Sequence, residues 1–198
     1  MKPYSINFFI KAMIFYSGEE KVLILLRLCL RINHMLAFLI IIFGFLSRIV
    51  VHTPNFSPVL SLALFGGTYL KGRQAIWVPM VLMALSDAVL GFHDTMVFTW
   101  GSILVISLIG SYLCRHNNWA NVLSASIFSS LFFFVVTNFG AFLSLYPHTL
   151  AGLQQCYILA IPFYQSTLVS TVAYSLVLYI IYEWALKNST GTVLARLV

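Results

Sequence analysis

Long apolar runs separated by short polar segments make up most of the sequence between residues 35 and 186. The runs lie at Leu36–Val51, Pro58–Leu70, Ala75–Gly91, Met96–Leu113, Val122–Leu145 and Leu159–Leu186. Most of them would be apolar on every side of a helix, so lipid rather than water has to surround them. Charged residues are only 8 % of the chain and its mean hydropathy is +0.95, whereas about 25 % of the residues in a soluble domain are charged. The sequence therefore predicts an integral membrane protein.

Helices are the expected way for these runs to cross the membrane. Apolar and polar residues do not alternate with a period of two, so membrane strands are not predicted, and helices satisfy every backbone group in lipid. The 198 residues have room for about six passes of roughly 20 residues each. We therefore predict an all-α membrane protein, a bundle of about six transmembrane helices. The second run is short, and its helix either begins near Asn55 or does not fully span, while Gly66 and Gly67 predict close helix packing.

Basic residues predict the orientation of this bundle. If both termini are cytoplasmic, Arg48 lies at the outer face, and the cytoplasmic side holds Arg27, Arg31, Lys71, Arg73, Arg115, Lys187 and Arg196. This distribution satisfies the positive-inside rule and predicts a multi-pass protein of the bacterial inner membrane. The net charge of +6 is scattered singly rather than gathered in a stripe, so the expected partner is the lipid bilayer and not nucleic acid.

Residues 1–34 differ from the membrane domain predicted at residues 35–186. They carry several charges, and their apolar run at Phe8–Tyr16 is interrupted by Lys11 and too short to span. Two interpretations stay open: a genuine interfacial helix, or an N-terminal extension outside the native protein, with Met35 as the initiator. Residues 187–198 are expected to form a cytoplasmic tail.

Polar groups gather in the three segments that this topology places outside. The last of them is predicted to be a long loop that reaches from Tyr146 beyond Tyr157 and enters the final span through Pro162. Aromatic and amide groups in such loops can stack on and hydrogen-bond a small organic ligand. The predicted ligand-binding residues come from all three segments: Asn55, Asp87, His93, Asn138, Tyr146 and Tyr157.

Asp87 carries the most information of these residues, because it lies about one helical turn inside the third run. An ionisable group within a span is costly and faces the bundle interior or a wet cavity. One interpretation is a contact to a ligand or cation. The other is a structural aspartate that is capped by serine, threonine or Arg48 near the interface.

A metal site at the same end is a further hypothesis. Imidazole and carboxylate groups suit divalent first-row ions, and the candidate ligands are His52, Asp87, His93 and Asp94. No compact H-x-x-x-H or H-E-x-x-H spacing fixes these ligands. Asp94 is equally well explained as the cap of the helix that begins at "TMVFTW".

Motifs for catalysis and for cofactor binding are missing from the sequence. It contains no G-x-x-x-x-G-K-[ST] loop, no G-x-S-x-G elbow and no C-x-x-C pair. We therefore expect a protein that is not an enzyme, binds no cofactor and does not hydrolyse ATP on its own.

Three blocks of the sequence carry a family resemblance: "PNFSPVLSLALFGGTYL", "VPMVLMALSDAVLGFH", and "FFFVVTNFGAFL" with "YPHTLAGLQQCYILAIPFY". Over about residues 35 to 186 the chain resembles an uncharacterised family of small bacterial six-helix inner-membrane proteins related to the S components of energy-coupling-factor transporters. The resemblance implies a bundle that captures a small ligand from outside, with a separate membrane coupling subunit and ATPases supplying the energy. The A-x-x-x-A docking pattern of many S components is missing from "MLAFLIIIFGFLSRIV".

Two functions follow from these observations. The first is a membrane-embedded solute-binding or uptake component, which captures a vitamin-like compound or a metal ion from the outer face. The alternative is a non-transporting integral membrane partner or assembly protein, which the small-residue helix faces and the missing docking pattern favour.

Overall fold

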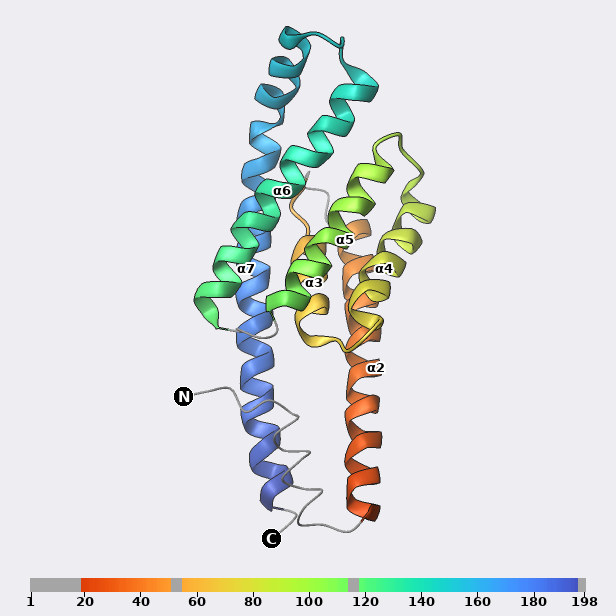
Figure 1. Ribbon diagram of the computed structural model, residues 1–198, viewed down its shortest axis with the longest axis vertical. Coiled ribbons are helices and arrows are strands. Elements are labelled where there is room, and N and C mark those ends of the chain that lie inside the picture. The colour runs from red at the N-terminus through yellow and green to blue at the C-terminus, as the bar shows by residue number, and fades with distance from the viewer. Residues whose placement is uncertain (1–18, 51–54, 114–117, 196–198) are drawn as a thin grey trace.

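The computed structural model describes residues 19–50, 55–113 and 118–195, and within them the side chains of residues 34–50, 55–113 and 118–185. These residues form six helices (Figure 1): α2 (Glu19–Val50), α3 (Val59–Tyr69), α4 (Gln74–Leu90), α5 (Met96–Leu113), α6 (Trp119–Leu145) and α7 (Leu150–Ala195). No strand occurs in this part of the chain. The all-helical prediction is confirmed, and α3, α4 and α5 begin and end within one residue of the predicted apolar runs.

Successive helices run in opposite directions, and α2, α6 and α7 extend beyond the shorter helices α3, α4 and α5 (Figure 1). The C-terminus of α2, the N-terminus of α3, the α4–α5 loop and the α6–α7 loop all lie toward one end, which is at the top of Figure 1. We call it the upper end. The polar segments that the sequence groups together therefore lie toward the same end of the molecule.

The shortest helix, α3, lies at the centre of the bundle. Every residue from Val59 to Gly67 is buried, and α3 contacts α2, α4, α5, α6 and α7. Its 11 residues span roughly 16 Å, about half of the hydrocarbon thickness of a bilayer. Backbone that is enclosed by protein can end at membrane depth, because it does not face lipid. Of the two predicted possibilities, the structure shows the short helix, which does not begin near Asn55.

A pair of glycines lets α3 and α5 cross closely. A methyl group on Gly67 would overlap the carbonyl oxygen of Ser107, and one on Gly110 would overlap that of Leu64. A methyl group on Gly66 would instead meet Pro79 Cγ at 3.5 Å, which is an ordinary contact. The predicted close packing is confirmed for Gly67, whereas Gly66 lies beside the crossing and not in it.

The loop between α6 and α7 is much shorter than the sequence predicts. Only residues 146–149 connect the two helices, so Tyr157 lies in the early turns of α7, and Pro162 lies inside this helix. Thr149 starts the helix: its Oγ1 accepts the N–H of Gly152 at 3.1 Å, and its carbonyl oxygen accepts that of Leu153 at 3.0 Å. The prediction of a long outer loop is therefore wrong, because a capped helix begins before the continuous apolar run does.

Among the residues that the structure describes, three helices are long and apolar enough to cross a membrane by length and composition: Met96–Leu113, Trp119–Leu145 and Leu150–Ala185. Shorter apolar helices occupy His34–Val50, Val59–Tyr69 and Gln74–Leu90. These features are compatible with a membrane protein. The backbone of α2 continues across the domain boundary predicted between residues 34 and 35, and that of α7 across the one between 186 and 187.

Candidate functional site

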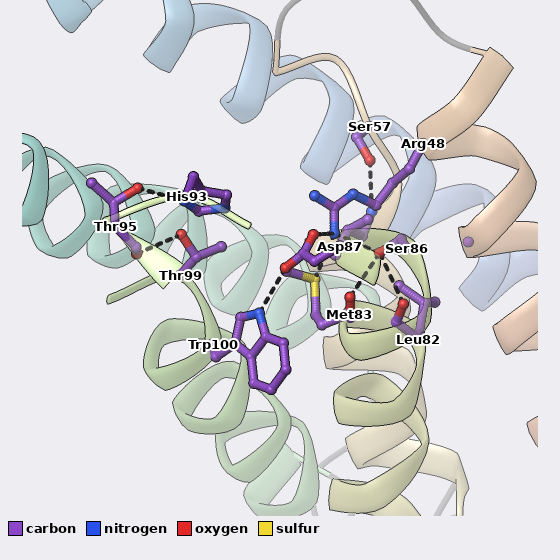
Figure 2. Close-up of polar contacts among 12 residues, drawn as sticks. Arg48, Ser57, Leu82, Met83, Ser86, Asp87, His93, Thr95, Thr99 and Trp100 are labelled. Atoms are coloured by element: carbon purple, nitrogen blue, oxygen red, sulfur yellow. Dashed lines mark hydrogen bonds and ion pairs between the residues drawn. The ribbon is translucent and has the colours of Figure 1, made fainter. Parts of the chain in front are cut away.

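An ion pair joins α2 to α4 toward the upper end of the bundle (Figure 2). Arg48 Nη1 lies 2.7 Å from Asp87 Oδ1. Asp87 is fully buried, whereas 18 % of the Arg48 side chain is exposed. A buried carboxylate without a partner costs several kcal/mol, so the guanidinium makes the burial of Asp87 possible. Pairing with Arg48, one of the two interpretations of Asp87, is thus present in the structure.

Trp100 holds the other oxygen of the same carboxylate. Its Nε1–H donates to Asp87 Oδ2 at 2.7 Å (Figure 2). Asp87 is close to the end of α4 and Trp100 close to the start of α5, so the short hairpin between the helices sets them at the same level. Trp100 is not among the residues predicted from the sequence. An indole N–H in an apolar helix requires an acceptor, and Asp87 lies at the matching level of the hairpin, so this pairing could have been predicted.

The hydrogen bond from Trp100 predicts a loss of stability in Trp100→Phe. A hydrogen bond to a charged group contributes about 1.5–3 kcal/mol, so this variant should unfold at a lower temperature in detergent than the wild type. Trp77→Phe is the matched control, because Trp77 is 64 % exposed on α4. Equal unfolding temperatures of the two variants would show that the indole N–H does not stabilise Asp87.

Two further contacts fix the guanidinium of Arg48. Its Nη1 donates to Ser86 Oγ at 2.6 Å and contacts Met83 Sδ at 3.2 Å. The Ser86 hydroxyl lies 2.9 Å from the carbonyl oxygen of Leu82, to which it donates its own proton, and therefore accepts from Arg48. Within the described part of the chain, all contacts of the guanidinium use Nη1. Its Nη2 and Nε atoms make no hydrogen bond or ion pair to a described residue.

A cavity of about 280 Å³ adjoins Arg48, where the end of α2 meets the starts of α3 and α5 and the end of α4. Residues from α6 and α7 complete its lining. The polar lining residues are Ser47, Arg48, Asn55, Ser57, Thr99 and Thr167. The apolar ones are Phe56, Val59, Leu60, Met83, Leu90, Ile103 and Phe133. An apolar wall with a few polar groups that converge from several elements is typical of a small-molecule site.

One of the predicted ligand-binding residues, Asn55, lines this cavity. Asp87 does not line it, but its ion-pair partner Arg48 does. Asn55 has a backbone φ of 59°, a left-handed conformation that asparagine adopts more readily than most residues. The segment before α3 therefore brings an amide group to the cavity at a position where few other side chains are tolerated.

The predicted metal ligands are not brought together. His93 and Asp94 are exposed in the α4–α5 loop, and His93 Nδ1 lies 2.9 Å from Thr95 Oγ1. Figure 2 shows this histidine apart from the Arg48–Asp87 pair. Among the side chains that the structure describes, no group of three or more His, Cys, Asp or Glu residues could hold a metal ion. The fourth candidate ligand, His52, lies outside the described residues.

The remaining predicted residues belong to the α6–α7 hairpin. Asn138 Nδ2 donates to the carbonyl oxygen of Phe134 in its own helix at 2.8 Å. Tyr157 donates from α7 to the carbonyl oxygen of Val135 in α6 at 2.7 Å, and Tyr146 is the C-terminal cap residue of α6. Asn138, Tyr146 and Tyr157 do not line the cavity. The polar groups of Asn138 and Tyr157 instead hold the backbone of the hairpin.

Comparison with known proteins places the chain in a family. No curated protein and no solved structure matches it. A family model described as a family of unknown function matches residues 30–193, which include both partners of the ion pair, the lining of the cavity and nearly all of the helical bundle. The chain therefore belongs to this family, DUF6580.

Proposed function

We propose that the chain is a membrane-embedded solute-binding component that takes a small molecule from the outer face into the cavity beside Arg48. One observation carries this proposal: a cavity with both polar and apolar lining lies beside Arg48, and the ion pair with Asp87 fixes the guanidinium at its wall. The cavity is the place where a solute would be held.

In this proposal all six helices lie in the membrane, with the upper end outward and both termini in the cytoplasm. The basic residues support this orientation, because Lys71 and Arg73 belong to the α3–α4 loop at the opposite end from the cavity. The central position of α3 supports the count of six, since a helix too short to span alone is enclosed by the others. The protein would then be a multi-pass protein of the bacterial inner membrane.

The volume of the cavity limits the size of the solute. A cavity of about 280 Å³ is close to the lower end of the range for small-molecule pockets, roughly 300–1,000 Å³, so it suits a small ligand. The mixed polar and apolar lining suits an organic molecule of the vitamin-like kind better than a bare ion.

The energy source belongs to a separate partner in this proposal. The sequence has no nucleotide-binding loop, and its resemblance to S components of energy-coupling-factor transporters suggests a membrane coupling subunit with ATPases. The missing A-x-x-x-A pattern means that docking to such a subunit would use another surface of the chain.

Native mass spectrometry of the protein purified from its own membrane tests the proposal. We expect a retained small molecule in the wild type and its loss in Thr99→Phe, because a phenyl ring at this position fills part of the cavity. Thr137→Phe is the matched control: Thr137 is half-buried like Thr99 and donates to the backbone one turn earlier in the same way, but it does not line the cavity.

Three results would contradict the proposed site or the proposed function. Loss of the molecule in His93→Ala or Asn138→Ala, with full retention in Thr99→Phe, would move the site to the loop and hairpin residues. Retention of a divalent metal ion instead of an organic molecule would overturn the proposed solute class. A protein without any small molecule, in a stable stoichiometric complex with another membrane subunit, would favour the alternative of a non-transporting partner or assembly protein.

A further inference from the structure

Three of the four hydroxyl groups in the cavity lining already donate their proton to a backbone carbonyl oxygen. Ser47 donates its proton to the carbonyl oxygen of Gly44 at 2.7 Å, and Thr99 donates to that of Thr95 at 3.1 Å. Thr167 does the same toward Phe163 at 2.9 Å. Because a hydroxyl has one proton and two lone pairs, these three oxygens can only accept hydrogen bonds from a ligand. A ligand in the cavity therefore needs N–H or O–H groups to meet them.

Arg48, in contrast, requires a hydrogen-bond acceptor on the ligand. It is the only charged residue of the cavity lining within the described part of the chain, and its Nη2 and Nε atoms can only donate. A ligand that uses these atoms must present an acceptor oxygen or nitrogen. The lining thus combines guanidinium donors with the hydroxyl acceptors of Ser47, Thr99 and Thr167, while the Asn55 amide and the Ser57 hydroxyl can donate as well as accept.

The ion pair limits the charge of the ligand. Asp87 already neutralises Arg48, and no carboxylate lines the cavity in the described part of the chain. A bound anion would add a net negative charge to this neutral pair, and a bound cation would add a positive charge with no carboxylate of the lining to balance it; both are costly in a low-dielectric interior. A molecule without net charge avoids both costs.

We propose that the ligand of this cavity is a small molecule without net charge that places a carbonyl or carboxylate oxygen on Arg48 and N–H or ammonium groups on the hydroxyl oxygens of Ser47, Thr99 and Thr167. Zwitterionic amino acids and uncharged amide heterocycles share this chemistry. Phosphate esters, free amines and divalent cations do not. This inference rests on the proposed function, because it names the class of solute that the same site takes.

Equilibrium dialysis with a defined mixture tests the charge rule. The mixture contains phenylalanine with its analogues 3-phenylpropanoate and 2-phenylethylamine, nicotinamide with nicotinate, and phenyl phosphate with Zn²⁺. We expect the protein to enrich phenylalanine or nicotinamide and none of the charged compounds. Preferential enrichment of a carboxylate, an amine, the phosphate ester or the metal ion would overturn the inference while leaving solute binding intact.

The retention experiment decides the case in which nothing in the mixture is enriched. If native mass spectrometry finds a retained molecule, its formula and charge show whether it is net-neutral with at least one N–H or O–H group, and an anion or a cation contradicts the inference. If no molecule is retained and none is enriched, the proposed function fails, and the inference about its ligand fails with it.

Thr167→Val tests the role of the hydroxyl oxygens, since it keeps the shape of the side chain and removes the acceptor. The affinity for the enriched or retained compound should fall about tenfold, which corresponds to one lost hydrogen bond. Thr137→Val is the matched control, because its hydroxyl makes the same backbone bond outside the cavity and its loss should not change the affinity. An unchanged affinity in Thr167→Val would contradict the assigned contact.

Discussion

Arg48→Met should lower the free energy of unfolding by about 3–5 kcal/mol, because it leaves the carboxylate of Asp87 buried without its counter-charge. Asp87→Leu should lower the free energy of unfolding by a smaller amount. The guanidinium that it leaves unpaired is partly exposed and adjoins the polar-lined cavity, where water can hydrate it. Unfolding of both variants in a detergent titration measures the two losses.

The double variant Arg48→Met/Asp87→Leu separates the ion pair from the packing of the two side chains. Replacing a buried pair by apolar groups of similar size is often close to neutral, so the double variant should be more stable than Arg48→Met alone. Asp94→Leu serves as the control, because Asp94 is exposed in the α4–α5 loop and its loss should change little. If the losses in the two single variants simply add in the double variant, Arg48 and Asp87 do not interact energetically.

Gly67→Ala is expected to destabilise the bundle by about 3 kcal/mol, the upper part of the range for overpacked cores. The added methyl group would overlap the carbonyl oxygen of Ser107 on α5. A flexible side chain could turn away from such an overlap, but a helix backbone cannot, so α3 and α5 have to separate. The same unfolding titration measures the loss.

Gly66→Ala supplies a control one residue away in the same helix. Its methyl group would meet Pro79 Cγ at 3.5 Å, and alanine favours a helix over glycine by roughly 0.5–1 kcal/mol. We therefore expect Gly66→Ala to be as stable as the wild type or slightly more stable. Equal losses in the two variants would show that the crossing of α3 and α5 is not as close as the structure has it.

The sequence predicts helix ends most accurately where the hydropathy of a single segment decides them. Hydropathy and turn residues predict the ends of α3, α4 and α5 within one residue, because a helix in this chain ends where its apolar run meets a polar or glycine-containing turn. The signal failed at α7. There the capped start at Thr149 lies before the continuous apolar run, and Pro162 is accommodated inside the helix.

The candidate site shows what the sequence cannot predict about side-chain partners. The sequence singles out Asp87 as an ionisable group inside an apolar run, and the predicted topology places Arg48 at the outer face; both predictions follow from the free-energy cost of charge in lipid. It does not show that Asn138 donates its amide within α6, or that Tyr157 reaches back to Val135. These outcomes depend on the rotation of each helix, which the packing of neighbours decides.

By itself the sequence determined the helical character of the chain and the polar groups that need partners, and it predicted the membrane class, because apolarity and chain length act on each segment independently. Only the tertiary structure decided that the shortest helix is the central one, that Trp100 shares Asp87 with Arg48, and that Asn55 and not Asn138 lines the cavity. Such contacts join segments far apart in the chain. They are fixed by the way side chains and close-packed glycines fit between helices, a property that no single segment carries.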